Sequence, residues 1–294
     1  MNIPNNFCGL GKEFSEYNTS KVVILPVPYD GTRTWIIGKK WLKNDASKGP
    51  EGIIEASKNL ELFDIELNTT PAENGIHTLP YLEVTKDPET VINKVKLEAS
   101  KHLTQNKFVV MLGGEHSISY GLYLALREKY KDVSVVQIDA HSDLRESFDG
   151  TKFSHASVMA RIRETAKQVV QVGIRSMSEE EAEIIKKKKY DIFYAHTIYN
   201  KKDWIDKALS KLGKHVFVTI DIDGFDISTI PATGTPEPGG LDWYLVLDFL
   251  KHVFSKKQVV GFDVVELAPN EYSTAADFAA AKLIYKLIGY KFYK

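Results

Sequence analysis

Short apolar runs rich in β-branched residues recur along the chain, and longer segments with helical spacing separate them. Each run is too brief for a helix and has no polar face, which is typical of strands buried on both sides of a parallel sheet. This pattern predicts strands at residues 21–28, 107–112, 133–139, 168–173, 191–194, 215–221 and 259–266. Helices are predicted at residues 88–103, 118–130, 178–189, 203–212, 242–254 and 275–288.

The alternation of predicted strands and helices favours an α/β fold, with a mostly parallel sheet and helices on both of its faces. The sequence contains no long linker, internal repeat or low-complexity tract, so we expect a single domain over residues 1–294. In sheets of this kind the binding crevice lies beyond the carboxyl ends of the strands. Those ends are therefore the places where functional residues are expected.

Composition and charge narrow the classes of partner. The 38 Lys and Arg residues nearly balance the 39 Asp and Glu residues and form no basic stripe, so nucleic acid is not expected as a partner. No stretch approaches the roughly 18 apolar residues that a membrane span needs. Cys8 is the single cysteine and the amino terminus lacks a signal-peptide pattern, so we expect a cytoplasmic protein with no membrane partner.

Side chains that bind metals follow three of the predicted strands: His116, Asp139, His141, Asp143, Asp221 and Asp223. Asp139, His141 and Asp143 alternate along the chain, so an extended segment presents all three on one face. The outer pair would stand about 13 Å apart in a straight strand, so either the chain curls or two ions share the ligands. Taken singly, such an aspartate is often a turn former or a helix cap, and His116 is equally compatible with a hydrogen-bonded core histidine.

Together, however, these residues favour a metal centre. Asp139, Asp143, Asp221 and Asp223 would bring a charge of about −4 into one crevice, which a low-dielectric site holds only with cations. Carboxylates with some imidazole and no thiolate suit manganese; zinc, iron or cobalt fit less well, and the histidines disfavour calcium. Two such ions lower the pKa of a bridging water until hydroxide exists near neutrality, which predicts a hydrolase.

These residues lie in stretches that resemble the ureohydrolase family, meaning the arginase and agmatinase group. The matching stretches are GGEHSIS (113–119), DAHSD (139–143), FSHASVMAR (153–161), DIDGFD (221–226), PATGTPEPGGL (231–241) and GFDVVELAP (261–269). They occur in the family's order, and residues 28–32 and 49–53 are similar to its amino-terminal pattern. The resemblance is therefore effectively full-length, and it implies a three-layer α/β/α fold.

The resemblance also implies two manganese ions per subunit and a set of ligands for them. One ion would be held by His116, Asp139, Asp143 and Asp221. The other would be held by Asp139, His141, Asp221 and Asp223. Asp139 and Asp221 would then bridge the ions, and the loop at residues 231–241 would lie beside the site.

Two further residues gain a role through the resemblance. By itself His155 is compatible with a cap of the next helix, and Glu266 with a strand end that meets water. The resemblance implies instead that His155 shuttles a proton to the departing amine and that Glu266 pairs with the substrate guanidinium. Asp143 would accept a hydrogen bond from the attacking hydroxide, which bridges the metals.

The substrate predicted by the resemblance is agmatine, hydrolysed to putrescine and urea. Residues 144–152 and the stretch that follows are similar to bacterial and archaeal agmatinases and differ from arginases. Formiminoglutamases share Asp143-Leu144-Arg145 but usually lack the shuttle histidine. Guanidinobutyrate, arginine and aminopropylagmatine remain open as substrates, and a non-catalytic, metal-binding member of the family is a further alternative.

Two other expectations follow from the resemblance. Family members commonly form trimers or hexamers, so we expect a homo-oligomer. Residues 35–38 and the longer insertion at residues 41–48 depart from the family pattern, where the link is commonly shorter. If this insertion borders the mouth of the site, agmatine itself becomes a less secure prediction.

Overall fold

The computed structural model describes residues 3–33, 45–199, 201 and 203–293 of the chain. In this part of the chain, one sheet contains eight strands, and all neighbouring strands are parallel. Their order across the sheet is β2 (Ile76–Thr78), β1 (Val22–Val27), β3 (Phe108–Gly113), β8 (Gln258–Val265), β7 (His215–Asp221), β4 (Val133–Ile138), β5 (Val169–Ile174) and β6 (Asp191–Tyr194).

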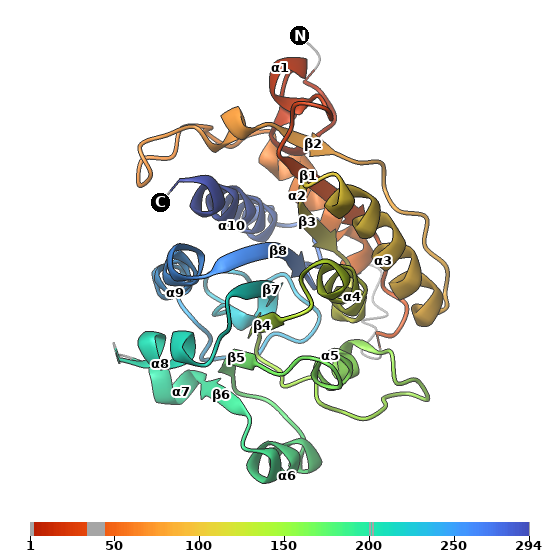
Figure 1. The fold of residues 1–294 in the computed structure, drawn as a ribbon, viewed down its shortest axis with the longest axis vertical. Coiled ribbons are helices and arrows are strands. Elements are labelled where there is room, and N and C mark those ends of the chain that lie inside the picture. The colour runs from red at the N-terminus through yellow and green to blue at the C-terminus, as the bar shows by residue number, and fades with distance from the viewer. Residues whose placement is uncertain (1–2, 34–44, 200, 202, 294) are drawn as a thin grey trace.

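Helices cover both faces of the sheet (Figure 1). One face carries α2 (Gly49–Ser57), α7 (Ala195–Ile198), α8 (Trp204–Ser210), α9 (Trp243–Lys256) and α10 (Ala275–Phe292). The other carries α3 (Pro88–Thr104), α4 (Ser119–Tyr130), α5 (Val158–Arg163) and α6 (Glu179–Lys188). The short helix α1 (Lys12–Ser15) lies near the amino terminus. The expected three-layer α/β/α architecture is thus confirmed.

The apolar character of the strands follows from this arrangement. In β3, Val110 and Leu112 pack into the core beneath α2, α9 and α10, whereas Val109 and Met111 pack into the core beneath α3 and α4. Both sides of the strand are therefore buried, and the residues alternate between two cores. This burial is the physical reason why the strands appear in the sequence as continuous apolar runs.

The predicted strands and helices are all present, with ends displaced by a few residues, and one strand and four α-helices of the described part of the chain were not predicted. The strand β2 is only three residues long and pairs with β1 alone, so it leaves little pattern in the sequence. The helices α1, α2, α5 and α7 were not predicted either. The prediction that Glu266 ends a strand is wrong by one residue, because β8 ends at Val265 and Glu266 takes a left-handed φ of 63°.

The strand order places the candidate site. The central strands β3, β8, β7 and β4 come from distant parts of the sequence. Among them, the direction in which successive strands are added across the sheet reverses, although all the strands run parallel. Parallel strands end at the same edge, and a crevice forms outside that edge where the order reverses. None of the helices in the described part of the chain combines the length and apolar character that crossing a bilayer requires.

Candidate metal centre and active site

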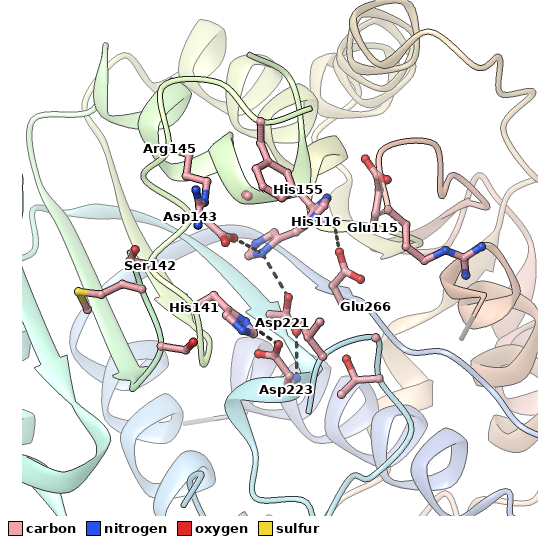
Figure 2. A pocket seen from close by; sticks show the side chains of 18 of the residues that line it. Glu115, His116, His141, Ser142, Asp143, Arg145, His155, Asp221, Asp223 and Glu266 are labelled. Atoms are coloured by element: carbon pink, nitrogen blue, oxygen red, sulfur yellow. Dashed lines mark hydrogen bonds and ion pairs between the residues drawn. The ribbon is translucent and has the colours of Figure 1, made fainter. Parts of the chain in front are cut away.

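The residues predicted to bind metal converge at this edge of the sheet (Figure 2). Asp139 follows β4, and His141 and Asp143 lie in the loop after it. Asp221 is the last residue of β7, and Asp223 lies in the turn that follows it. The chain does curl after β4, because Asp143 adopts a left-handed φ of 54°. That curl brings the outer aspartate of the alternating motif back toward the first.

His116 is the centre of the first candidate group of ligands. Its Nδ1 lies 3.1 Å from Asp139 Oδ2, 3.1 Å from Asp143 Oδ2 and 3.5 Å from Asp221 Oδ2, yet makes no well-formed hydrogen bond. Its other nitrogen, Nε2, lies 2.8 Å from Thr219 Oγ1. With Nε2 as the donor, Nδ1 faces three acceptor oxygens with its lone pair. The two separations of 3.1 Å match neighbouring ligands around a small octahedral ion, about 3.0 Å apart for bonds of about 2.1 Å.

A second candidate group consists of Asp139, His141 and Asp223, whose ligand atoms lie within 4.8 Å of one another. His141 Nδ1 is 2.9 Å from Asp223 Oδ2 and 3.7 Å from Asp139 Oδ1. Asp139 therefore belongs to both groups, as expected for a bridging ligand. Asp221 offers Oδ2 to the first group, while its Oδ1 accepts the backbone N–H of Asp223 at 2.9 Å, so it is a cap as well as a candidate ligand.

The electrostatics of this cluster fit cations. Burial raises the pKa of both Asp139 and Asp221 well above the ordinary range. The negative charges of neighbouring carboxylates add to this effect: those of Asp143 and Asp223 act on Asp139, and those of Asp223 and Asp139 act on Asp221. Burial opposes protonation of His141, but Asp223 and the other aspartates outweigh it and raise the pKa of His141 to about 11. The cluster therefore attracts positive charge, which protons or divalent ions can supply.

Backbone hydrogen bonds hold the carboxylates in place. Asp139 Oδ1 accepts the N–H of His141 at 2.6 Å, and Asp223 Oδ1 accepts the N–H of Ala140 at 2.9 Å. Sterics require a glycine directly before Glu115, because a Cβ on Gly114 would lie 1.8 Å from the carbonyl oxygen of Tyr29. The turn that presents His116 thus packs directly on the neighbouring backbone.

Arg175 connects the turn that contains Asp223 to the loop at residues 231–241 by hydrogen bonds. Its guanidinium donates to the carbonyl oxygens of Asp223 at 2.6 Å, Glu237 at 2.9 Å and Pro238 at 3.1 Å. The loop at residues 231–241 is therefore tied to the turn that carries a candidate ligand. Its Thr233, Gly234 and Thr235 also line the cavity at the site, as the prediction for this loop requires.

Seven of the eight predicted site residues line one cavity of about 310 Å³, and Asp139 is completely buried against it. Glu266 faces His116. The backbone N–H of His116 donates to Glu266 Oε1 at 2.7 Å, and the backbone N–H of Glu266 donates to the carbonyl oxygen of Gly114. These two bonds explain why the chain turns at Glu266 instead of continuing β8. Burial and the charges of Asp221 and Glu115 raise the pKa of Glu266 well above its ordinary range.

His155 lies at the start of the turn before α5, and its side chain does not cap that turn. Its ring meets Phe148 edge-on, with 5.6 Å between ring centroids, and Nδ1 lies 3.1 Å from Thr32 Oγ1. Burial lowers the pKa of His155, and the charge of Asp143 opposes that effect. His155 is thus held in the wall of the cavity and not in solvent.

Two buried glutamates at the site were not predicted. Glu115 accepts hydrogen bonds from Thr32 N and Oγ1 and from Ser117, and burial raises its pKa to about 7. Its signal in the sequence is a charged residue directly after a buried strand and two glycines. Glu181 accepts from Ser142 Oγ and Leu144 N, and so holds both sides of Asp143.

The predicted insertion falls partly outside the described residues: residues 35–38 and 41–44 belong to the segment that the structure does not describe. Arg33 and Ala46, which flank residues 34–44 in the sequence, both line the cavity. The N–H of Ala46 donates to Asp30 Oδ2 at 2.9 Å, and Arg33 pairs with the same oxygen at 3.0 Å. Arg33, before the undescribed segment, and Ala46, within the predicted insertion, therefore both contact Asp30.

Comparison with known proteins supports the resemblance on which these roles depend. The sequence profile of the arginase family matches residues 20–289. The chain belongs to the arginase family. Family membership makes the protein a hydrolase acting on carbon–nitrogen bonds, and the two groups described above supply candidate ligands for the binuclear centre of this family.

Similar members of the arginase family carry informative names. The chain is 38% identical to an N(1)-aminopropylagmatine ureohydrolase of Synechocystis sp., over 99% of this chain and 97% of that protein. It is 40% identical to a protein of the same name from Thermus thermophilus, over 96% and 94% of the two chains. A crystal structure of agmatine ureohydrolase of Thermoplasma volcanium superposes with a TM-score of 0.86 at 31% identity, covering 98% of this chain and 94% of that one.

Proposed function

We propose that the protein hydrolyses the guanidinium group of an alkylguanidine with a distal amine, and releases urea and an amine. The observation that carries this proposal is the cavity in which two ligand groups share Asp139 and lie beside Glu266 and His155. The donor set of carboxylates and imidazoles favours two manganese ions per subunit. Ions bound there would supply a water with a pKa low enough for it to ionise near neutral pH.

The residues of the chain then divide the work of the reaction. Glu266 binds the guanidinium, whose planar fork of N–H donors suits a carboxylate. Asp143 accepts a hydrogen bond from the attacking oxygen and orients it toward the guanidinium carbon. A new carbon–oxygen bond forms and the bond from carbon to the alkylated nitrogen breaks. His155 gives that nitrogen a proton as it leaves, and the proton of the added hydroxyl passes to Asp143 as the carbonyl of urea forms.

Within this substrate class we favour N1-aminopropylagmatine, with agmatine as the second candidate. Two relatives named for aminopropylagmatine are 38% and 40% identical, whereas two proteins named for agmatine are 34% and 31% identical. Ala46, within the insertion predicted at residues 41–48, also lines the cavity, and agmatine is a less secure prediction if this insertion borders the site. Aminopropylagmatine is agmatine with an additional aminopropyl group, so it has a longer tail and one more amine.

The test is a measurement of urea release from four guanidines: aminopropylagmatine, agmatine, guanidinobutyrate and arginine, each with added manganese. We expect the two amine-tailed substrates to give the highest kcat/KM, and aminopropylagmatine to exceed agmatine. A preference for arginine or guanidinobutyrate would contradict the proposed class. Absence of urea from every substrate would favour the alternative of a non-catalytic, metal-binding protein.

The role of His155 is tested by His155→Ala. We expect kcat to fall by roughly 10²–10⁴-fold, the usual contribution of general acid–base catalysis, because the leaving nitrogen loses its proton donor. Metal content, measured by plasma mass spectrometry, should stay the same, since His155 belongs to neither ligand group. An unaltered kcat would remove His155 from the mechanism.

A further inference from the structure

Thr32 contacts both His155 and Glu115, although neither contact is visible in the sequence. The Thr32 hydroxyl oxygen lies 2.7 Å from Glu115 Oε1 and 3.1 Å from His155 Nδ1. The same oxygen also lies 3.2 Å from the backbone nitrogen of His155. Glu115 Oε2 is 2.6 Å from the backbone nitrogen of Thr32, so the threonine is held at two points on that side.

The hydrogens in this arrangement can be assigned from the partners. A backbone N–H can only donate a hydrogen bond. The Thr32 hydroxyl oxygen therefore accepts the hydrogen bond from the backbone N–H of His155. The single hydroxyl proton of Thr32 then points to Glu115, which also receives the Thr32 N–H and the Ser117 hydroxyl. With its proton committed to Glu115, the Thr32 oxygen can only accept from His155 Nδ1.

We propose that Thr32 is a positioning residue which keeps the proton of His155 on Nδ1 and the ring in one orientation, so that Nε2 is the nitrogen that serves the substrate. The proposal rests on the role of His155 given above. Glu115 is the anchor of this arrangement, because it fixes the direction of the Thr32 hydroxyl. A ring turned over by 180° would place a carbon atom against the Thr32 oxygen and lose this hydrogen bond.

The placement of the three residues supports a positioning role. Thr32 follows β1, Glu115 follows β3, and His155 precedes α5, so three separate segments meet at one hydroxyl. Glu115 is also the residue directly before His116 in the turn that carries a candidate metal ligand. The Thr32 hydroxyl thus links the position of His155 to that of the ligand turn. The edge-on contact with Phe148 also limits movement of the His155 ring.

The first experiment compares Thr32→Val with Thr32→Ser. Valine keeps the shape of threonine without the hydroxyl, and serine keeps the hydroxyl. Loss of a hydrogen bond that orients a metal-ligating histidine typically costs about 10–100-fold in affinity or activity. We expect a loss of the same size in kcat for Thr32→Val, with KM and metal content unchanged. Thr32→Ser should recover most of this loss. As a matched control, Thr165→Val removes a hydroxyl that bonds Tyr123; neither residue lines the cavity, so kcat should not change.

The second experiment repeats Thr32→Val in a His155→Ala background, where it should cause no further loss of kcat because the group that Thr32 positions is absent. A further loss in that background, or a normal kcat for Thr32→Val alone, would overturn the proposal. So would a loss in Thr32→Ser equal to that in Thr32→Val.

A third measurement does not depend on activity. In protein labelled with ¹⁵N histidine and loaded with diamagnetic zinc, the His155 resonances should show the Nδ1–H form in the wild type and a mixture of forms in Thr32→Val. The same spectrum in both proteins would refute the role of Thr32. If the wild type released no urea from any guanidine, the proposed function would fail, and these spectra would still decide whether Thr32 fixes the state of His155.

Discussion

Asp139 is completely buried and is the single residue common to both candidate ligand groups in the described part of the chain. Gln137 Nε2 and the N–H of His141 each donate to one of its oxygens, at 2.6 Å. Two carboxylate oxygens therefore serve two hydrogen bonds and both ligand groups at once. Such sharing makes the position intolerant of change, because any substitution alters two sites together.

The first prediction follows from this sharing. Asp139→Asn keeps the size of the side chain but removes its charge and replaces one acceptor oxygen with a donor, so we expect loss of both ions. Asp223→Asn is the matched variant, because Asp223 belongs only to the second group. It should retain about one ion per chain. Plasma mass spectrometry after equilibration with manganese gives the content, and equal losses in the two variants would contradict a bridging role for Asp139.

At the residue scale, the sequence was informative where chemistry lies next to a strand end. Asp139, Asp221 and Asp223 directly follow apolar runs, and the fold necessarily brings such ends together. The Thr32 contacts could not be predicted in this way, because their partners lie 83 and 123 residues away. Only the packed structure brings that hydroxyl between Glu115 and His155.

At the scale of elements, predictability depended on length and on the number of buried sides. The central strands are buried on both sides and were predicted from their apolar runs. The three-residue edge strand β2 left no such run. The helix α2 did carry a start signal, Pro50 in its first turn, but residues 49–53 were interpreted only as part of a family pattern.

A charged contact joins the segment after α2 to two helices. Glu66 accepts hydrogen bonds from Lys251 of α9 at 2.8 Å and from Tyr290 of α10 at 3.1 Å, and it also pairs with Lys286 of α10. Lys286 in turn lies 3.1 Å from Asp64. Burial alone would raise the pKa of Glu66, but the bonds from Lys251 and Lys286 outweigh it and lower the pKa to about 2.

The second prediction concerns this contact and acid. Because the folded-state pKa of Glu66 lies below its ordinary value of 4.5, its ionised form stabilises the fold above pH 4.5, and this stabilisation is lost as pH falls toward 2. We therefore expect the stability of the wild type to exceed that of Glu66→Gln near neutral pH, and the difference to shrink in acid. Urea unfolding midpoints at several pH values measure it. The exposed Glu73→Gln is the control, and a difference that stays constant with pH would contradict the assignment.

At the scale of the whole molecule, the site is made from segments spread over most of the chain. His116, Asp139, Asp221 and Glu266 lie at or just after the ends of four adjacent strands, and β8, the last strand in sequence, lies in the middle of the sheet. The chain must therefore fold almost completely before the ligands meet. The sheet itself is buried between two hydrophobic cores that do not involve these ligands. Assembly of several such chains into a trimer or hexamer stays a prediction, which light scattering after size-exclusion chromatography can test.

The third prediction follows from this separation between cores and site. Without metal, the raised pKa of Asp139 and Asp221 lets the cluster take up protons, so we expect the stripped protein to stay folded with an unchanged far-ultraviolet circular dichroism spectrum. Metal binds only the folded chain, and at about 100 times its Kd an ion adds about 2.7 kcal/mol of stability. For a chain of this size that corresponds to a rise in Tm of about 4 °C per ion, which calorimetry measures.

Two comparisons make this prediction specific. Asp139→Asn should lose the rise in Tm, because neither group of ligands is then complete. In the wild type the rise should diminish as pH falls, since metal must displace the protons that the cluster holds when it is empty. Unfolding on removal of metal would show that the ions, and not the two cores, support the sheet. An equal rise in Tm for Asp139→Asn would place the ions away from this cluster.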